Sequence, residues 1–494
     1  MKGIDIEELS GALDVLANEL NAFLRHDPLP RSVSDACAKI LERLGHPPDV
    51  VCRQFSVGSH SYWVLFFAGS TDDALISQGI LYPLLAHADD TLNPTTVPIG
   101  QVRSVTTLTD AVQQLLAHQA LVADQTSGRW WAFDVGQPPT RSVSEPSNAK
   151  VVHGPHDGFV EQWVINLALL RQYLQTPYLR VETLTVGFWT QTTVAVIYLE
   201  GLAEGKVVSQ VHAKLSQTSL RGLVDSSRIA MALGGPWVIP TVQYSERPDQ
   251  VAAALIQGRV AIMMDKSPSV LLVPTRFTDL MSRPGDYYQL PLTGSLTRFL
   301  RYIGTIAATT LPAVYVAALT VNPSFIPLSL YLTTVRTRLA IPFPVVIETV
   351  MMLVVVDIVQ EAGLIMPGAL GQTVTIFGTL ILGDAAIKSG IVSAPTLITV
   401  TLAMLTQFLI PDANLMSVTR LIRYALLPLA AVFGFTGIVS GWMLLLGLGV
   451  GLESYGTPYF SPLAPLRPGG WRDTVVRMPR QKRKRAPFIG RGAL

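Results

Sequence analysis

Long apolar runs are concentrated between about Phe299 and Leu452. Five apolar segments follow one another there, at 302–321, 343–360, 373–387, 391–410 and 425–450. A helix rises about 1.5 Å per residue, so ~20 apolar residues cross a ~30 Å hydrocarbon core. The first, fourth and fifth runs pass this length test, whereas the second and third contain or adjoin acidic residues or glycines. Soluble cores seldom contain so many such helices, so the pattern predicts an α-helical polytopic membrane domain over 298–452.

The preceding residues show shorter patterns that are typical of a soluble α/β fold. Apolar residues at alternating steps of three and four predict an amphipathic helix over 4–24, and buried strands are expected at 62–67 and 192–199. Residues 259–265 and 269–274 are predicted to form a hairpin. We expect a two-lobed α/β cytoplasmic N-terminal region. Its predicted parts are subdomain 1 over 1–135, a linker at 136–141 and subdomain 2 over 145–290.

Charge distribution suggests an orientation. Arg298 and Arg301 precede the first apolar run, and a basic cluster at 480–485 lies in a predicted cytoplasmic tail, 453–494. The positive-inside rule places both ends in the cytoplasm, which requires an even number of crossings. We therefore predict about four crossings and expect 343–360 to be re-entrant or interfacial. Arg420 and Arg423 would then lie outside, which counts against this arrangement.

Ionisable residues within the apolar region are candidate intramembrane groups, because charges at bilayer depth are costly and usually face a bundle interior, water or one another. Asp357 and Glu361 are four residues apart and share a helix face. Glu348 lies about 180° from Asp357 around a helix, so this helix is poorly suited to lie wholly in lipid. Asp384 and Lys388 can neutralise one another at i, i+4. For that pair a buried bridge between helices is a simpler interpretation than a role in a pore.

Composition and motifs exclude several classes of function. The net charge of +2 indicates no nucleic-acid partner, and Cys37 and Cys52 form no metal or disulfide motif. The N-terminus lacks the basic start and apolar core of a signal peptide. Gly-Leu-Ala-Glu-Gly-Lys-Val at 201–207 is too short for a phosphate loop and lacks its Ser or Thr. We therefore expect no enzyme, no cofactor and no metal site.

Several motifs occur in an order that points to one family. They are Gly-Pro-His-Asp-Gly-Phe-Val-Glu at 154–161 with Asn166 and Leu-Leu-Arg at 169–171, Ser-Glu-Arg-Pro-Asp at 245–249, Asp-Lys-Ser-Pro at 265–268, Pro-Gly-Asp-Tyr-Tyr at 284–288, Ile-Pro-Phe-Pro-Val-Val-Ile-Glu at 341–348, Pro-Gly-Ala-Leu-Gly-Gln at 367–372 and Ser-Pro-Leu-Ala-Pro at 461–465. Together they resemble the GerA family of spore germination proteins, A-type subunit, over roughly 145–475.

The resemblance marks signature residues Glu161, Asn166, Glu246, Arg247, Pro248, Asp249, Pro342, Pro344, Gly371 and Gln372. These can bind a ligand or be structural. Pro248 is favoured at a first helical position, and Glu246 favours the same helix N-terminus. Lys266 replaces the family's glycine, which suggests that this turn does not need a positive φ.

The resemblance implies a germinant-receptor subunit in the spore inner membrane. It would work with a permease-like B subunit, which senses the germinant, and a lipoprotein C subunit, and would form a homo-oligomeric, nutrient-gated ion channel in the bilayer. Residues 267–275 are also similar to the stage V sporulation AF protein, an accessory relative. A secondary transporter is a further alternative, although no inverted repeat is evident. A membrane-anchored scaffold stays open too.

Overall fold

The computed structural model describes residues 27–57, 60–86, 97–137, 154–218, 221–234, 239–365 and 383–466, with single residues 378, 381 and 474. The chain divides into two compact units. The first contains the described residues up to Leu233 together with Tyr244–Val273, and the second contains Gly234–Gln243 and the described residues from Pro274 onward. The predicted helix 4–24 and the basic cluster 480–485 lie outside the described residues, as does part of the predicted linker 136–141.

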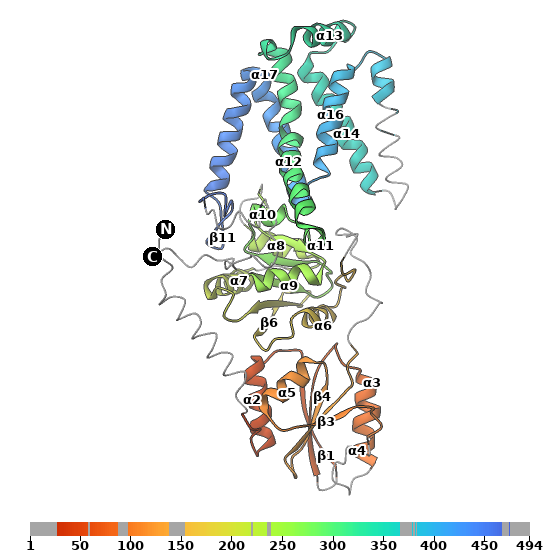
Figure 1. Cartoon of the computed structure of the whole chain (residues 1–494), viewed down its shortest axis with the longest axis vertical. Coiled ribbons are helices and arrows are strands. Elements are labelled where there is room, and N and C mark those ends of the chain that lie inside the picture. Colours follow the sequence, from red (N-terminus) through yellow and green to blue (C-terminus); the bar gives the residue numbers. More distant parts are fainter. Residues whose placement is uncertain are drawn as a thin grey trace. The chain divides into compact units, whose positions relative to one another are not determined.

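The first unit begins with a five-stranded antiparallel sheet covered on both faces (Figure 1). Its strand order is β1 (Val50–Val57), β2 (His60–Phe67), β4 (Ala120–Asp124), β5 (Arg129–Phe133) and β3 (Val102–Val105). Alternate strand residues point to opposite faces. Leu65 and Leu121 therefore pack with α2 (Val33–Leu44) and α5 (Leu108–Leu116), whereas Val64 packs with the helical segment α3 (Asp73–Leu75), η1 (Ile76–Leu81) and α4 (Tyr82–Ala86).

A second five-stranded sheet completes the first unit. Its order is β6 (Leu179–Val186), β7 (Thr192–Leu199), β9 (Val260–Met264), β10 (Val270–Val273) and β8 (Gln243–Ser245). Helices α6 (Trp163–Tyr173) and α9 (Pro248–Ile256) build its main core, and α7 (Gly205–Gln217) and α8 (Ser226–Leu233) complete the lobe. The two-lobed α/β region and the β9–β10 hairpin are thus as the sequence predicts.

The turn of that hairpin corrects one prediction. Lys266 has a φ of 68°, in the left-handed region that favours glycine. The turn therefore does require a positive φ, and lysine adopts it. The Lys266 N–H donates to the carbonyl of Glu161 at 2.6 Å, which holds the turn in this conformation.

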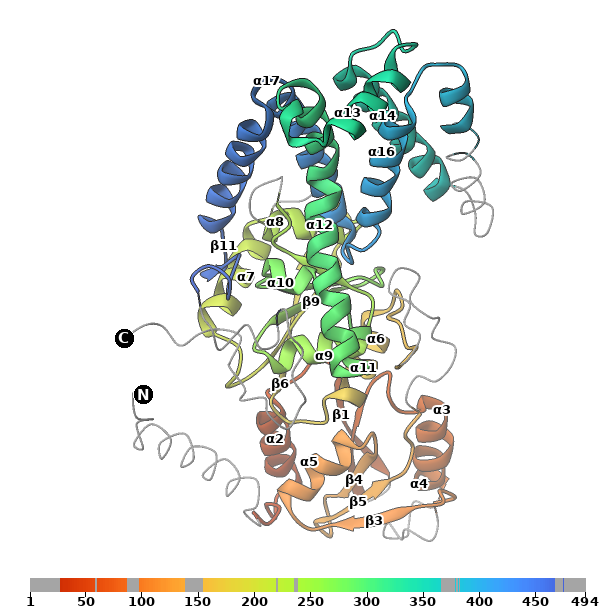
Figure 2. The ribbon, with the colours of Figure 1, turned by 45° about the horizontal axis from the view of Figure 1, so that its top comes forward.

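The second unit is a helical bundle around α12 (Pro291–Thr320), which contacts α14 (Val345–Ile365), α16 (Ala394–Gln407) and α17 (Ala413–Val450) (Figures 1 and 2). Its smaller elements are α10 (Phe277–Leu280), α11 (Gly285–Tyr288), η3 (Pro323–Phe325) and α13 (Leu328–Arg338). The β11 (Glu453–Ser454) and β12 (Thr457–Pro458) hairpin leads to Tyr459, which is buried against Leu280 and Leu415. The predicted tail from residue 453 thus begins with a packed segment.

The apolar run 425–450 is two helices rather than one predicted span. Gly434 has a φ of 62° and a ψ of −140°, and it divides α17 into two arms. A side chain on Gly441 would lie 2.6 Å from Leu426 Cδ2, and one on Gly437 would meet the Leu429 carbonyl. The second arm therefore folds back onto the first, and these two glycines allow their close approach. Gly447, by contrast, has open space beside it.

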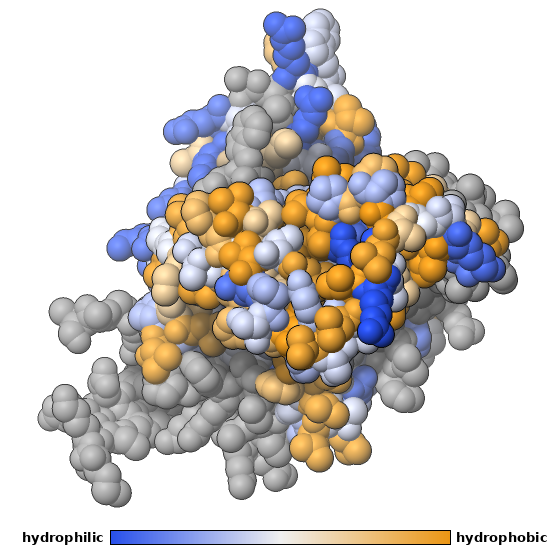
Figure 3. All heavy atoms as spheres, turned by 90° about the horizontal axis from the view of Figure 1, so that it is seen from above, coloured by the Kyte–Doolittle hydropathy of each residue, from blue (hydrophilic) through white to orange (hydrophobic). Residues whose placement is uncertain are grey.

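Apolar side chains cover the outer faces of this bundle. Large exposed ones include Leu292, Phe299 and Ile303 on α12, Ile347 and Ile358 on α14, Ile398 and Leu405 on α16, and Phe433, Met443 and Leu444 on α17. Viewed from above, apolar residues make up much of the surface shown (Figure 3). Among the described residues, α12 is long and apolar enough to cross a membrane, and so is α17 if its two arms are counted as one helix. Such an outward apolar surface is unusual for a soluble domain.

Candidate functional site

Asp357 of α14 faces a group of polar side chains from α17. Arg423 Nη2 lies 3.2 Å from Asp357 Oδ1, and Arg420 Nε lies 3.6 Å from the same oxygen. The Tyr424 hydroxyl donates to Asp357 Oδ2 at 2.6 Å. Arg423 also donates to Gln407 of α16 at 3.3 Å, and Arg420 to Gln360 at 3.4 Å. These six residues, the Asp357 cluster, join three helices.

The charges in the Asp357 cluster do not balance. Two guanidinium groups face one carboxylate, and Arg423 is only 1% exposed. A buried charge that loses its partner is strongly destabilising, so Asp357 is the group that makes burial of Arg423 tolerable. Arg420, Arg423 and Tyr424 reach Asp357 together because residues three and four apart lie on one helix face.

Glu348, nearer the start of α14, forms a second polar connection. Its Oε1 accepts hydrogen bonds from the Ser393 N–H at 2.6 Å and the Ser393 hydroxyl at 2.7 Å. Ser393 is the N-cap of α16, where a helix dipole favours a negative charge. Arg338 Nη2 of α13 lies 3.1 Å from Glu348 Oε2. The Ser393 hydroxyl also pairs with Thr396, which in turn pairs with Tyr315 of α12, each at 2.9 Å.

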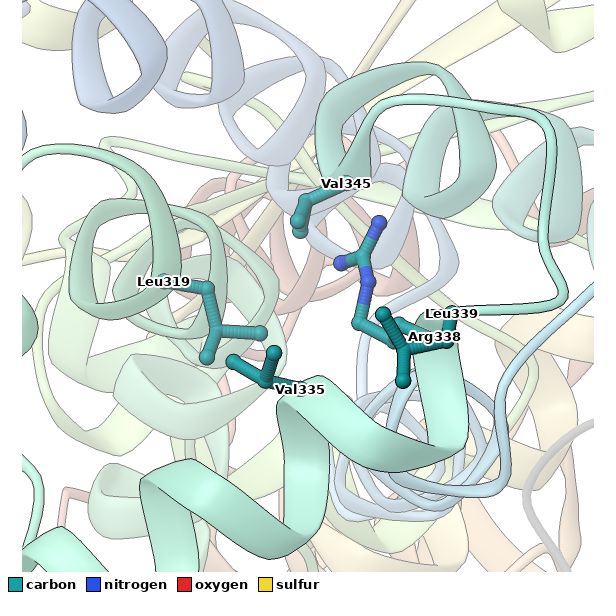
Figure 4. Close-up of a pocket in the computed structure, with 5 residues that line it drawn as sticks. All are labelled: Leu319, Val335, Arg338, Leu339 and Val345. Atoms are coloured by element: carbon teal, nitrogen blue, oxygen red, sulfur yellow. The ribbon is translucent and has the colours of Figure 1, made fainter.

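Arg338 also lines a small cavity at the α13 end of the bundle. Figure 4 shows that Leu319, Val335, Leu339 and Val345 line this cavity together with Arg338, whose guanidinium group points toward Val345. The cavity has a volume of about 180 Å³. Its lining is apolar apart from Arg338, so it shows no arrangement of polar groups that would orient a polar ligand.

These contacts explain how α14 carries acids on two faces. Glu348 is fully buried against Arg338 and Ser393, whereas Asp357 is partly buried against α17, so each acid faces partners in the bundle. Residues 345–365 form one continuous helix that contacts α12, α16 and α17. Glu361 is exposed, so the structure brings only Asp357 of that pair into the cluster.

Asp384 and Lys388 form an ion pair of 2.7 Å within one helical segment. The predicted mutual neutralisation is therefore confirmed, whereas the predicted buried bridge between helices is wrong. The two side chains are 59% and 76% exposed. The i, i+4 spacing lets them meet on one helix surface without a second helix.

Arg298 and Arg301 lie inside α12, which begins earlier than the apolar run. Both are buried against Asp286 of α11: Arg301 Nη1 donates to its Oδ2 at 2.7 Å and Arg298 Nε to the same oxygen at 3.1 Å. Burial alone would raise the pKa of the Asp286 carboxyl, but the hydrogen bonds and charges of these arginines outweigh it and hold the pKa below its usual value. This cluster fixes α11 to the first long helix.

Three of the family-like motifs meet at one structural junction in the second lobe. Arg247 donates to Asp249 at 3.0 and 2.8 Å and to the Pro155 carbonyl at 2.9 Å. The Glu246 carbonyl accepts from the Phe159 N–H. Asn166, fully buried, exchanges two hydrogen bonds with the Val160 backbone. Glu161 is exposed, and only its carbonyl joins the junction, through Lys266.

The helix N-terminus at this junction is largely as the sequence predicts. Pro248 is the first residue of α9. Asp249, rather than Glu246, is the acid of its first turn, because Glu246 precedes the helix. Pro342 and Pro344 are exposed before α14, where the Pro344 carbonyl accepts from the Glu348 N–H. Gly371 and Gln372 lie outside the described residues.

A buried ion pair joins the two lobes of the first unit. Arg171 of α6 donates to both carboxylate oxygens of Asp49, at 2.7 and 2.9 Å, and its guanidinium carbon lies 4.3 Å from the centre of the Phe67 ring. Arg171 belongs to the Leu-Leu-Arg motif at 169–171, but no sequence pattern points to Asp49. Within the described residues, no three His, Cys, Asp or Glu side chains are placed to hold a metal ion.

The chain thus combines a two-lobed α/β region with a helical bundle that has an apolar exterior and buried ion pairs. The chain matches the family model described as Bacillus/Clostridium GerA spore germination protein over residues 38–489. It therefore belongs to the GerA family, with A-type subunits among its relatives.

Two relatives from Bacillus subtilis (strain 168) show the extent of the similarity. Uncharacterized membrane protein YfkQ is 33% identical over 440 residues, covering 87% of this chain and 86% of the relative. Spore germination protein KA is 31% identical over 460 residues, covering 91% and 85%. A crystal structure of the N-terminal domain of the A subunit of the Bacillus megaterium spore germinant receptor GerK3 matches with a TM-score of 0.41 and 25% identity, over 51% of this chain and 98% of that domain.

Proposed function

We propose that this chain is the membrane-embedded A subunit of a spore germinant receptor and that it converts a nutrient signal into ion release. It would lie in the spore inner membrane with both termini in the cytoplasm, and it would act as an oligomeric ion channel without catalysing a reaction. Its proposed partners are a permease-like B subunit, a lipoprotein C subunit and further copies of itself. Family membership and the outward apolar surface of α12, α14, α16 and α17 support this assignment.

The Asp357 cluster is the observation that carries the proposal. Charged groups inside a membrane bundle are costly and usually serve ion pathways, relays or conformational switches. Asp357 faces two arginines three residues apart on α17, at 3.2 and 3.6 Å. A small rotation or shift of α17 would bring Arg420 closer to Asp357 and move Arg423 away from it. Such an exchange provides two discrete arrangements for gating.

Potassium flux through liposomes that contain the purified chain tests this role. We expect Asp357→Asn to abolish most of the flux, while Asp384→Asn, which changes an exposed pair, leaves it near wild type. Size-exclusion chromatography would establish that each variant is folded. Absence of flux from the folded wild-type chain would contradict the channel, and saturable counterflow of a labelled solute would indicate a transporter instead.

A further inference from the structure

The turn between β6 and β7 in the second lobe carries two exposed aromatic side chains. Phe188 and Trp189 are 74% and 78% exposed, and their rings pack edge to face with centres 5.1 Å apart. Val224, just before α8, and Met231 on α8 are 78% and 81% exposed. No large apolar side chain elsewhere in the described part of this lobe is more than 51% exposed. These four side chains, the aromatic-turn patch, lie outside the core of the lobe, and such patches mark contact surfaces.

Hydrogen bonds hold the aromatic turn in one conformation. The Trp189 N–H donates to the Arg221 carbonyl at 2.9 Å. The Thr190 hydroxyl accepts from the Leu223 N–H, also at 2.9 Å. The turn is therefore bonded to the segment that leads into α8, and its two rings project from a backbone that is already ordered. Such ordering lowers the entropic cost of binding.

Basic side chains accompany the aromatic-turn patch. Arg221 is exposed, and Arg228 shares the exposed face of α8 with Met231, three residues further on. Asp225 is the acid between the two arginines, and its carboxylate accepts a hydrogen bond from the Ser226 hydroxyl at the start of α8. Aromatic side chains next to arginine are typical of protein surfaces that bind anionic lipid, with the rings at headgroup depth and the guanidinium groups at the phosphates.

The chain itself connects this lobe to the helical unit with the apolar exterior. It enters that unit at Gly234, directly after α8, returns to the lobe at Tyr244 and leaves it again at Pro274. When the helical unit is embedded in a bilayer, these connections give the lobe a high effective concentration at the lipid surface. A few inserted side chains, which would bind lipid only marginally by themselves, then suffice. A separate protein partner has no such advantage.

We propose that the aromatic-turn patch inserts into the headgroup region of an anionic phospholipid bilayer. Phe188 and Trp189 enter the boundary between headgroups and acyl chains, and the two arginines bind lipid phosphates. The second lobe thereby gains an attachment to the membrane in addition to its chain connections. This proposal rests on the membrane embedding that the proposed function includes, but it does not require the chain to conduct ions.

The experiment places an environment-sensitive nitrobenzoxadiazole label beside the turn. In a Cys37→Ser, Cys52→Ser background, the full-length chain carries the label at Gln191→Cys, because Gln191 is exposed and both aromatic rings remain. The chain is reconstituted into nanodiscs of phosphatidylcholine and phosphatidylglycerol. We expect blue-shifted emission, and loss of emission when the phosphatidylcholine carries a doxyl quencher near the headgroup. A label at Ser34→Cys, exposed on α2 of the other lobe, is the control and should show neither effect.

Replacing the aromatic pair decides the proposal. Phe188→Ser with Trp189→Ser should remove the blue shift and the quenching, while an unchanged Tm shows that the lobe is still folded. Arg221→Gln with Arg228→Gln should weaken quenching in the anionic nanodiscs but not in pure phosphatidylcholine.

Three results would overturn lipid insertion. They are a label that is neither shifted nor quenched with both rings present, quenching that persists without the rings, and a blue shift without quenching, which would mean that a second copy of the chain covers the turn. Equal quenching with and without the arginines would contradict their contact with phosphates. Ion flux from the same preparation tests the channel separately, so failure of one proposal is distinguishable from failure of the other.

Discussion

At the scale of single residues, four of the buried arginines share one pattern, because each lies against a carboxylate from another part of the chain. Asp49 holds Arg171, Asp286 holds Arg298 and Arg301, and Asp357 holds Arg423. Each guanidinium group also has further hydrogen-bond or aromatic contacts, which offset part of the cost of removing the charges from water. Removing one partner of such a pair should therefore lower the free energy of unfolding more than replacing both partners with apolar residues does.

The Asp49–Arg171 pair allows a direct test of that expectation. Arg171→Met leaves a buried carboxylate without its partner and is expected to cost ~3–5 kcal/mol of unfolding free energy. The double variant Asp49→Leu with Arg171→Met removes both charges and should recover most of the loss. Thermal unfolding of the three proteins measures this. A double variant as unstable as the single one would show that shape, rather than charge pairing, dominates.

His118 is expected to make the first lobe sensitive to acid. It is buried, with a φ of 63°, and neither ring nitrogen has a hydrogen-bond partner among the described residues. Burial first, and the charge of Arg171 second, lower the pKa of His118. The folded state therefore favours neutral histidine. Its contribution to stability is present above the unfolded pKa of about 6.5 and is lost as pH falls toward the lower folded pKa.

The variant His118→Asn tests this pH dependence. Asparagine tolerates the left-handed backbone conformation and does not titrate. We expect the Tm of wild type to fall more steeply than that of the variant between about pH 6.5 and pH 5. Parallel pH profiles for the two proteins would rule out His118 as the cause.

At the scale of elements, local patterns predict short elements well and long-range partners poorly. The β9–β10 hairpin and the start of α9 follow from turn residues and Pro248, which act locally. Glu348 and Asp357 stand out because acids are rare in apolar runs. The partners of these acids do not stand out in the sequence, because Arg423 lies 66 positions from Asp357 and just before an apolar run. Pairing over that distance depends on how the helices pack.

The sequence also does not predict the division of α17. Residues 425–450 are continuously apolar, and Gly434 is one of several glycines in that region. Only its backbone conformation distinguishes it: a φ of 62° with a ψ of −140° is nearly exclusive to glycine. Asn322 supports the turn, because its side-chain oxygen accepts from the Phe435 N–H at 3.0 Å.

Replacing Gly434 should therefore disturb the helical unit. Gly434→Ala is expected to cost about 1–3 kcal/mol in backbone strain, and its methyl group would also meet the Asn322 side chain. Gly447→Ala is the matched control, because it lies in the second arm with open space beside it and should be neutral or slightly stabilising. Thermal stability in detergent compares the two. Equal effects would mean that the Gly434 conformation is unimportant.

At the scale of the whole molecule, the paired acids and the turn at Gly434 revise the topology. The turn adds a helix to the predicted set, so an even number of crossings no longer requires 343–360 to be a re-entrant or interfacial segment. We propose that the N-terminal end of α12 lies on the cytoplasmic side and α13 on the opposite side. Thirty residues of helix span about 45 Å, more than the hydrocarbon core.

Cysteine labelling tests this orientation. In a Cys37→Ser, Cys52→Ser background, Ser329→Cys on α13 and Thr293→Cys near the start of α12 both place a thiol at an exposed position. A membrane-impermeant maleimide should label Ser329→Cys from outside intact cells and Thr293→Cys only in inverted vesicles. Labelling of both positions from one side would contradict the proposed crossing of α12.

The most direct measurement of the proposed function is potassium release from dormant spores that carry or lack the gene for this chain, after nutrients are added. We expect deletion to abolish release, and wild type and Asp384→Asn to restore it. Asp357→Asn, although present in the membrane at normal abundance, should not restore it. Normal release from the deletion strain would contradict a necessary receptor role, and full rescue by Asp357→Asn would contradict the gating role of the Asp357 cluster.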